Sequence, residues 1–385
     1  MSLPLGEVVT ILAVFAALVA LAGVMQAFAG WRAVVRFGSR GAQVGTRRPP
    51  VTILKPLHGA EPLLEEALAT FCTQDYPEYQ IVFGLQDRAD PALHVLRRLI
   101  ARFPDIDIDI VVNPAQHGCN RKVGNLINMY SAARHDVIVI ADSDIHVAPD
   151  YLDCLADTLF QPGIGLATTL YAGLASSDAL AARLGVSQIN HTFLPGALMA
   201  RALGRRDCLG ATMALTRDVL DSVGGFPALV HHLADDAVLG QLVRARGLEV
   251  ALAGTVPATT VPEQRMQPLF AHELRWARTI QSVAPVGFAL SLVQFPLFWA
   301  ALATTLSGGE QWCIALFGSV WLLRALVAFG IDRALSIAPA APIWLLPFRD
   351  LLSVAVILAS YGGTDVAWRG HVLTTSAPSL APGKG

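Results

Sequence analysis

Charged residues are scarce in this sequence of 385 residues. Asp, Glu, Lys and Arg make up 15% of the chain, whereas hydrophobic residues make up 54%, and the mean hydropathy is +0.50. An ordinary soluble domain carries about 25% charged residues, so part of this chain is expected to lie in lipid. The formal net charge of −2 gives no globally basic surface, and nucleic acid is therefore not an expected partner.

Cysteine is also sparse and lacks the spacing of a bridging or metal-binding framework. The five cysteines form no C-x-x-C pair and have no histidines at zinc-site spacing; they are Cys72, Cys119, Cys154, Cys208 and Cys313. Disulfide and zinc frameworks are therefore disfavoured, and reduced thiols or small core residues are expected. The sequence has no internal repeat.

A long apolar run stands near the start of the chain. Residues 8–29 carry no charge, which is about the 20 residues that a helix needs to cross a hydrocarbon core. The run exceeds the usual ~7 to 15 apolar residues of a cleaved signal peptide, and no basic residue precedes it. Basic residues follow it instead: Arg32, Arg36, Arg40, Arg47 and Arg48. By the positive-inside rule, residues 1–31 are expected to form a transmembrane anchor that leads into the cytoplasm.

Between residues 50 and 280, short β-like runs alternate with helical patterns. The expected strands are residues 51–54, 80–85, 106–112, 137–141, 164–170 and 208–215. The expected helices are residues 61–70, 91–103, 122–133, 149–160 and 234–246. This alternation predicts a cytoplasmic α/β domain with a mostly parallel sheet covered on both faces. Ligands of such sheets bind beyond the carboxyl ends of the strands, so polar residues there are the first candidates for a site.

Residues 284–365 are expected to form a C-terminal membrane region, followed by a tail over residues 366–385. Apolar runs over 284–306 and 312–330 predict two spans. A third run, 343–361, contains Arg349 and Asp350, which cost about 2.5 to 3.5 kcal/mol each at the centre of a membrane helix. This run is therefore either a third span or a re-entrant or interfacial segment.

An Asp-x-Asp motif follows the apolar strand expected over residues 137–141. Its carboxylates, Asp142 and Asp144, repel one another unless a cation or a proton lies between them. A divalent cation such as Mg²⁺ or Mn²⁺ fits, because it takes oxygen ligands and can also hold substrate phosphates. The alternative is a turn in which both side chains bond the backbone. The motif alone leaves both interpretations open.

Two further segments carry candidates for binding a nucleotide. Asp87 follows the strand expected over 80–85, and because Asp90 is better placed to cap the helix that Pro91 begins, Asp87 is free to accept hydrogen bonds from a base. Lys122 lies in a Gly- and Asn-containing loop that leads into a helix, where a cation and the helix N-terminus together would neutralise a diphosphate. The alternative for Lys122 is a solvated basic loop.

Two segments later in the sequence carry further candidate site residues. Asp235 and Asp236 begin the helix expected over 234–246, so either can cap it. Two adjacent carboxylates also favour a raised pKa on one of them, which suits proton abstraction from an alcohol. His272, Arg275 and Trp276 lie in a helical stretch before the C-terminal spans. The alternative for these last residues is anchoring at the membrane interface.

In this order, the acidic positions and the final Arg-Trp pair resemble the ceramide glucosyltransferase family, glycosyltransferase family 21. That family has an Asp after an early strand, an Asp-Ser motif after a middle strand, an Asp near a helix start, and a (Gln/Arg)-x-x-Arg-Trp motif before its C-terminal membrane segments. The matching positions are Asp87, Asp142 with Asp144, Asp236, and Arg275 with Trp276. His272 occupies the position usually filled by Gln or Arg, which leaves its contact open. The resemblance implies a GT-A nucleotide-diphospho-sugar transferase domain with one N-terminal and two to three C-terminal transmembrane helices.

Within that family, residues 210–215 and 232–236 look closest to a bacterial branch associated with hopanoid biosynthesis. The resemblance implies an inverting, multi-pass inner-membrane glycosyltransferase that moves N-acetylglucosamine or glucose from a UDP-sugar to a lipid alcohol, here a hopanoid. Ceramide is the alternative acceptor. A processive polysaccharide synthase is a second alternative, but two or three C-terminal spans are too few for its translocation pore. A non-enzymatic membrane scaffold would have no need for carboxylates at successive strand ends.

The implied roles divide the candidate residues into four groups. Asp236 is the expected catalytic base, assisted by Arg275 and Trp276. Asp87, Lys122 and Asp142 are expected at the donor. Asp142 and Asp144 are the expected metal ligands, and Asp235 and His272 are assigned to the acceptor or to a second acidic position.

Overall fold

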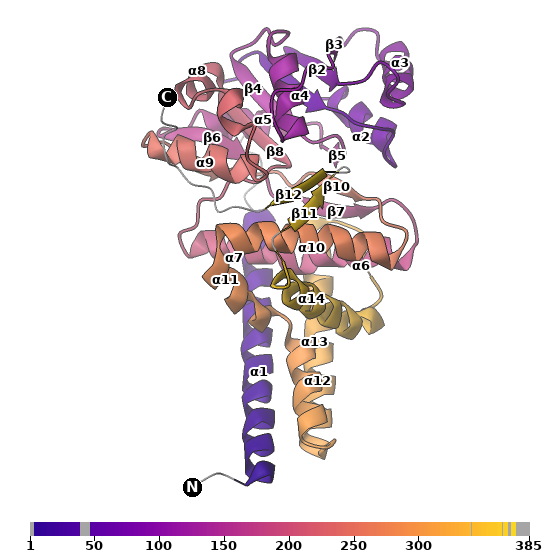
Figure 1. Ribbon diagram of the computed structural model, residues 1–385, viewed down its shortest axis with the longest axis vertical. Helices are drawn as coiled ribbons and strands as arrows, with labels where there is room; N and C mark the ends of the chain where they lie inside the picture. Colours follow the sequence, from indigo (N-terminus) through magenta and orange to yellow (C-terminus); the bar gives the residue numbers. More distant parts are fainter. Residues whose placement is uncertain (1–3, 39–46, 340, 364, 369–370, 375–385) are drawn as a thin grey trace. The chain divides into compact units, whose positions relative to one another are not determined.

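The computed structural model describes residues 4–38, 47–339, 341–363, 365–368 and 371–374. Arg40 and residues 375–385 of the expected tail lie outside the described residues. The chain divides into two compact units (Figure 1). One comprises residues 39–176 and 201–262 and is called the sheet unit here; the other comprises residues 1–38, 177–200 and 263–385 and is called the helix unit.

A seven-stranded sheet occupies the described part of the sheet unit, in the order β3-β2-β1-β4-β8-β6-β9. Its strands are β1 (Val51–Pro56), β2 (Tyr79–Leu85), β3 (Asp107–Val112), β4 (Val137–Ala141), β6 (Ile164–Thr168), β8 (Thr212–Thr216) and β9 (Glu249–Leu252). The pairs β1–β2, β2–β3, β1–β4 and β6–β9 are parallel, and β8 runs antiparallel between β4 and β6. The expected mostly parallel sheet is therefore confirmed.

Helices cover both faces of this sheet, which explains why β4 is apolar throughout. They are α2 (Leu64–Phe71), α3 (Ala92–Arg102), α4 (Arg121–Tyr130), α5 (Tyr151–Leu159), α8 (Arg217–Ser222) and α9 (Asp235–Ala245), with the 3₁₀ turn η2 (Phe226–Leu229). Successive side chains of a strand point to opposite faces. Accordingly, Val139 packs into a core with α2, α3 and α5, while Ile138 and Ile140 pack into a second core with α4 and α9. A strand buried on both sides needs a continuous apolar run.

A smaller sheet, in the order β5-β10-β7, follows the end of β4. Its strands are β5 (Ile145–His146), β7 (Ala172–Ala175) and β10 (Ala258–Val261). β5 begins directly after the Asp-x-Asp motif and pairs antiparallel with β10. This pairing fixes the backbone that carries the second Asp of the motif.

Three helical segments among the described residues are long and apolar enough to cross a membrane. They are α1 (Leu5–Gly38), α13 (Gln311–Leu335) and the segment Ile343–Ser360, which consists of η4 (Ile343–Leu345) and α14 (Leu346–Ser360). The protein is therefore a membrane protein with one N-terminal and at least two C-terminal candidate spans. A short hairpin, β11 (Asp365–Trp368) and β12 (His371–Thr374), follows them.

The span expected over residues 284–306 is a bent pair of helices. Pro285–Gln294, made of α11 (Pro285–Leu290) and η3 (Ser291–Gln294), meets α12 (Pro296–Leu306) at 66°. Proline has no backbone N–H and disfavours helical geometry in the residue before it. Phe295 accordingly leaves the helical region, at φ −109° and ψ 67°. The two pieces amount to one span only if they are taken together.

The two charged residues inside the third apolar run have partners within the helix unit. Both terminal nitrogens of Arg349 donate to the carboxylate of Glu273 on α10 (Met266–Val283), each at 2.7 Å. Asp350 accepts the backbone N–H of Leu297 at 3.1 Å, at the start of α12. The bidentate ion pair of Arg349, and the one hydrogen bond that Asp350 accepts through Oδ2, reduce the cost of charge in the middle of this segment, while Oδ1 of Asp350 is buried without a partner among the described residues.

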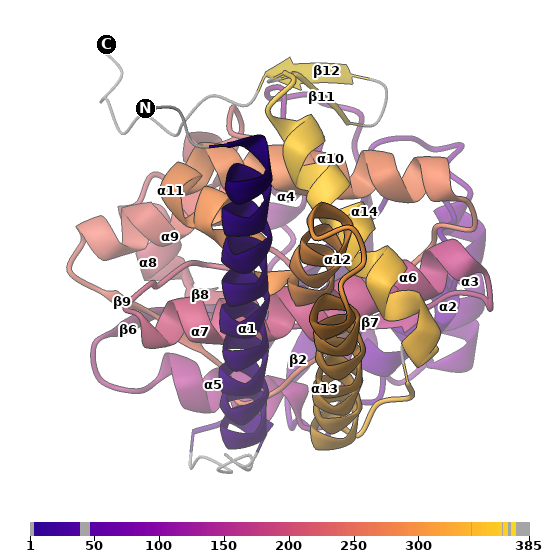
Figure 2. The same cartoon turned by 90° about the horizontal axis from the view of Figure 1, so that it is seen from below.

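Residues 177–200 contribute helices that the sequence patterns did not predict. They contain α6 (Leu180–Gln188), the π-helix η1 (Ile189–Phe193) and most of α7 (Leu194–Ala202). In Figures 1 and 2, α6 and α10 lie across α1 and α13 rather than alongside them. Both segments belong to the helix unit, and the sheet unit comprises residues 39–176 and 201–262; the cytoplasmic domain expected over 50–280 stays a prediction.

Candidate functional site

Asp142 lies directly after β4, at the carboxyl edge of the large sheet. Its backbone N–H donates to the carbonyl of Ala211 at 3.3 Å, which holds the start of the Asp-x-Asp motif against β8. Its side chain is 36% exposed, the most open of the acidic side chains with which Lys122 is paired. A ligand can therefore reach it.

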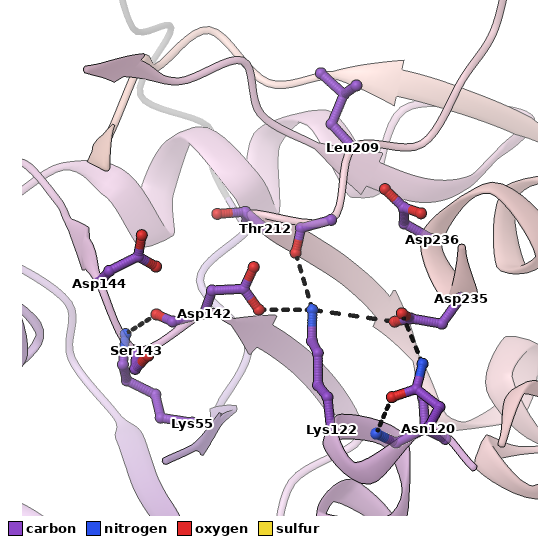
Figure 3. A network of polar contacts seen from close by, with 12 residues as sticks. Lys55, Asn120, Lys122, Asp142, Ser143, Asp144, Leu209, Thr212, Asp235 and Asp236 are labelled. Carbon is purple, nitrogen blue, oxygen red and sulfur yellow. Dashed lines mark hydrogen bonds and ion pairs between the residues drawn. The ribbon is translucent and has the colours of Figure 1, made fainter. Parts of the chain in front are cut away.

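Lys122 joins Asp142 to the start of α9 (Figure 3). Its Nζ donates to Oδ1 of Asp142 at 2.6 Å and to the carbonyl of Gly210 at 3.3 Å, and it lies 4.0 Å from Oδ2 of Asp235. Burial by itself lowers the pKa of Lys122, but Asp142, Asp235 and Asp236 outweigh that effect and raise the pKa above its usual value. The side chain is therefore a fixed positive charge between carboxylates.

Asn120 connects the starts of α4 and α9. Its side-chain oxygen accepts the N–H of Val123 at 3.1 Å, which caps α4, and its amide nitrogen donates to Oδ1 of Asp235 at 3.1 Å. Burial raises the pKa of Asp235, although Lys122 works in the opposite direction. Asp235 is thus held by a cap residue and a lysine, both from α4 or the residue before it.

Asp236 follows Asp235 in the first turn of α9. Its Oδ1 accepts the N–H of Ala237 at 2.8 Å, within the first turn of α9. Burial, followed by repulsion from Asp235, raises the pKa of Asp236 to about 6. A Cβ added at Gly210 would lie 3.0 Å from its Oδ2, so glycine there keeps space beside the carboxylate. Neither Asp is the N-cap of α9, which is Ala234.

Asp144 lies on the other side of Asp142, where β10 holds it. Its Oδ2 accepts a hydrogen bond from Thr259 Oγ1 at 2.6 Å, and its carbonyl accepts the N–H of Thr260 at 3.0 Å. Burial, followed by repulsion from Asp142, raises the pKa of Asp144 to about 6. Asp142 therefore destabilises the charged form of Asp144, and a cation bound between the two would relieve this repulsion.

The donor set of the motif fits a hard divalent cation held partly by the protein. Among the described residues, no group of three or more His, Cys, Asp and Glu side chains is arranged to hold a metal. Mg²⁺ is usually bound through one or two carboxylates, with water and substrate phosphates as its other ligands. Asp142 and Asp144 match that pattern.

Asp87 lies just beyond β2, at the same edge of the sheet. It is exposed, and its Oδ1 accepts the N–H of Ala89 at 2.8 Å in a tight turn. Asp90 is buried and accepts the N–H of Ala92, the first residue of α3, at 2.9 Å. Asp90 therefore serves the helix start, while Asp87 remains exposed.

The remaining predicted residues lie in the helix unit, on α10. His272 pairs through Nδ1 with Oε1 of Glu263 at 2.5 Å, and its ring lies edge-on to Trp276 with centroids 4.4 Å apart. Burial by itself raises the pKa of Glu263, but the hydrogen bond with His272 outweighs burial and lowers that pKa below its usual value. His272 and Trp276 thus form one side-chain group, and Arg275 lies between them in sequence. These residues do not belong to the unit that carries the acidic site.

Lys55 is a site residue that the sequence patterns missed. It lies on β1, is fully buried, and its Nζ donates to the carbonyl of Asp142 at 2.7 Å and lies 3.6 Å from the ring centroid of Phe71. Burial lowers its pKa to about 7, although Asp144 and Asp142 attract the charged form. A lysine inside an otherwise apolar strand was the available signal.

Residues 10–379 match the family model described as Glycosyl transferase family 21. Ceramide glucosyltransferase 1 of Caenorhabditis elegans is 27% identical over 210 residues, which cover 54% of this chain and 45% of that protein. Ceramide glucosyltransferase 3 of the same organism is 21% identical over 318 residues, or 73% of this chain and 68% of that protein. Ceramide glucosyltransferase of Komagataella phaffii is 36% identical over 113 residues, or 28% and 22%. The chain thus spans less than half of the length of two of these three relatives.

A solved structure with a similar fold is the mannosyltransferase PcManGT from Pyrobaculum calidifontis, in complex with GDP-Man and Mn²⁺. It has a TM-score of 0.51 and 20% sequence identity, over 91% of this chain and 99% of that chain. At this identity the likeness shows the fold alone, and that fold is the GT-A architecture expected from the sequence.

Proposed function

Because this chain belongs to glycosyltransferase family 21, we propose that it transfers a sugar from a UDP-sugar to the hydroxyl of a membrane lipid. The observation that supports this most is the position of Lys122 between Asp142, at the end of β4, and Asp235, at the start of α9. That arrangement places a positive charge and several carboxylates together at the ligand-binding edge of an α/β sheet.

On the donor side, Asp142 and Asp144 would hold a divalent cation, Mg²⁺ or Mn²⁺. When bound, such an ion acts as a Lewis acid for the negative charge of the departing nucleoside diphosphate. Lys122 adds a second positive charge at a fixed position, and a preorganised charge costs no rearrangement during the reaction. Asp87, exposed at the end of β2, is assigned to the nucleotide base.

On the acceptor side, Asp236 takes the proton from the attacking hydroxyl. Its pKa of about 6 leaves it mostly ionised near neutral pH, and yet basic enough to accept a proton. Asp235, held by Asn120 and Lys122, is a positioning residue beside it. One base on the acceptor side is typical of direct displacement, so the proposal includes inversion at the anomeric carbon and a β-linked product. Arg275, Trp276 and His272 keep, as a proposal, the roles that the family motif implies.

The lipid is proposed to be a hopanoid alcohol that receives N-acetylglucosamine. Ceramide with glucose is the second candidate, and the names of the curated relatives favour it. In both cases the lipid tail would stay in the bilayer that holds α1, α13 and α14. The exposed Arg32 and Arg36 after the apolar part of α1 support an inner-membrane protein with its sheet unit in the cytoplasm, where nucleotide sugars are made available.

The test is mass spectrometry of the lipids made by the purified full-length protein. It is offered UDP-N-acetylglucosamine or UDP-glucose, each with a hopanoid polyol or with ceramide. The matched variants are Asp142→Asn in the site and Asp136→Asn, whose side chain is 94% exposed, as the control. A glycolipid made by the wild type and by Asp136→Asn, and lost in Asp142→Asn, is expected. A series of products that differ by one sugar each would indicate a processive synthase. Absence of sugar transfer from both donors would favour a scaffold.

A further inference from the structure

The helix unit contains a pocket where four of its segments meet. These are α1, η1 with α7, η3 and α13, and the residues that matter here are Gln26, His191, Gly196, Gln294, Arg324 and Val327. The space is about 330 Å³ with its open mouth included. Its enclosed part has room for about one water-sized group, so it suits a single polar group rather than a whole sugar.

Arg324 provides the polar character of this pocket. It lies in α13 and is 2% exposed. Its Nη2 donates to the carbonyl of His191 at 3.2 Å, but its Nε and Nη1 have no hydrogen-bond partner among the described residues. A buried charged donor without an acceptor is costly. An oxygen atom bound in the pocket would supply the missing acceptor.

The π-helix η1 forms another part of the pocket wall. π-Helical turns inside α-helices occur frequently at functional sites. Here the turn carries His191, whose ring is held at both nitrogens: Nε2 pairs with Asp332 at 2.8 Å and Nδ1 with Ser187 at 3.1 Å. Because both ring nitrogens have protein partners, the side chain of His191 is held in place within the wall. The backbone carbonyl of His191 helps to orient Arg324.

The position of the pocket along α1 indicates what kind of molecule reaches it. Gln26 precedes the exposed Arg32 by six residues, which is about 9 Å along a helix. Arginines after an apolar run mark the end of the hydrocarbon region. The pocket therefore lies near the depth of lipid head groups, at the basic end of the span.

The charge around Arg324 favours a neutral ligand over an anion. Asp350, on α14, is close enough to Arg324 for its carboxylate to attract the guanidinium. The amides of Gln26 and Gln294 add groups that can both donate and accept. A hydroxyl group matches this set, because it accepts from a guanidinium and donates to an amide oxygen.

We propose that this pocket binds a hydroxyl on the head of the acceptor lipid, with Arg324 as the donor to its oxygen. The inference rests on the proposed function, since it names the lipid as the acceptor. It assigns Arg324, Gln26 and Gln294 to lipid binding, a role distinct from those proposed for the carboxylates of the sheet unit.

Gly196 allows a test that leaves Arg324 in place. Arg324→Gln is the obvious variant, but it also removes the bond to His191 and so risks the fold. A Cβ at Gly196 would lie 3.6 Å from Oε1 of Gln294, an ordinary contact, and alanine is a better helix former than glycine. Gly196→Ala should therefore fold, and Gly196→Leu should fill the pocket. The matched controls are Gly318→Ala and Gly318→Leu on α13, where no atom of the described residues lies within 4 Å of an added Cβ.

The measurement is retention of tritiated ceramide, and of a tritiated hopanoid polyol, by full-length protein in phosphatidylcholine nanodiscs without any UDP-sugar. We expect affinity for one of these lipids to fall in Gly196→Leu by about tenfold or more, the effect of losing one hydrogen bond to a charged donor. Gly196→Ala should lose less, and both Gly318 variants should match the wild type, with equal melting temperatures throughout.

Unchanged retention of both lipids in Gly196→Leu would overturn the proposal. Loss of copurified phospholipid with unchanged acceptor retention would also overturn it, because the pocket would then hold a bulk lipid. The proposed function fails separately: a wild type that retains the acceptor in this assay, but transfers no sugar to it, would refute the activity and leave the pocket assignment intact.

Discussion

Replacing Asp236 by Asn removes the proposed base and preserves the shape of the side chain. A positioned base contributes typically about 10² to 10⁴-fold in rate, so the barrier should rise by about 3 to 5 kcal/mol. The structure supports the full effect, because the pKa of about 6 gives an ionised carboxylate at pH 8 that the amide cannot replace. Asn can still accept the N–H of Ala237, so the start of α9 should remain intact.

Asp235→Asn is the matched comparison, one residue away on the same helix turn. Asp235 lies 4.0 Å from Lys122 Nζ and accepts from Asn120, so its replacement weakens the positioning of the lysine. Lys122 keeps its 2.6 Å contact with Asp142. We therefore expect a smaller loss of turnover than in Asp236→Asn, accompanied by weaker donor binding.

The assay measures turnover with saturating lipid beside the affinity for UDP-sugar, and circular dichroism melting checks the fold of both variants. Asp236→Asn should lose turnover with nearly unchanged donor affinity. Near wild-type turnover in Asp236→Asn together with an inactive Asp235→Asn would show that the two roles are exchanged. Poor donor binding in both would place the acidic pair in the donor site and the base elsewhere.

Three further predictions concern pH, metal and topology. The ionised form of Asp236 is the active one, so kcat/KM should fall about tenfold per pH unit below about 6 and stay level above it; a limb near pH 4 would contradict the raised pKa. Excess EDTA should abolish transfer and Mg²⁺ or Mn²⁺ should restore it, whereas full activity in EDTA would remove Asp142 and Asp144 as metal ligands. Cys119, the exposed cysteine of the five, should resist an impermeant maleimide in intact cells and react in opened ones, with Cys119→Ser as the control; labelling from outside would reverse the orientation.

The acidic edge of the sheet was predictable because its strand has few alternative placements. β4 begins and ends at the predicted residues, Val137 and Ala141, since burial on both faces requires a continuous apolar run. The link between Asn120 and Asp235 was not predictable: 115 positions separate them, and neither belongs to a local pattern. Lys55 was missed for a related reason, because its value comes from contacts with Asp142 and Phe71 that only the folded sheet creates.

The helices of residues 177–200 were missed because their apolar positions follow no single helical period. The π-helix Ile189–Phe193 shifts the helical repeat between α6 and α7, so the apolar positions do not keep one 3.6-residue register. Pro296 is a sequence signal for the bend at Phe295, but the apolar composition around it is equally typical of one continuous span. Composition thus indicates whether a segment lies in lipid, but it does not show whether the helix is straight or bent.

The bidentate pair of Arg349 with Glu273 has a mechanical consequence for α10. Glu273 follows His272 in the sequence and precedes Arg275 by two positions. The ion pair therefore joins α10, the helix that carries the family motif, to α14. Sliding α10 by one turn, about 5.4 Å, would separate the two charges and leave both buried without compensation. The position of the motif along α14 is thereby fixed by an ion pair. A thinner or thicker bilayer that tilts α14 would carry the motif with it.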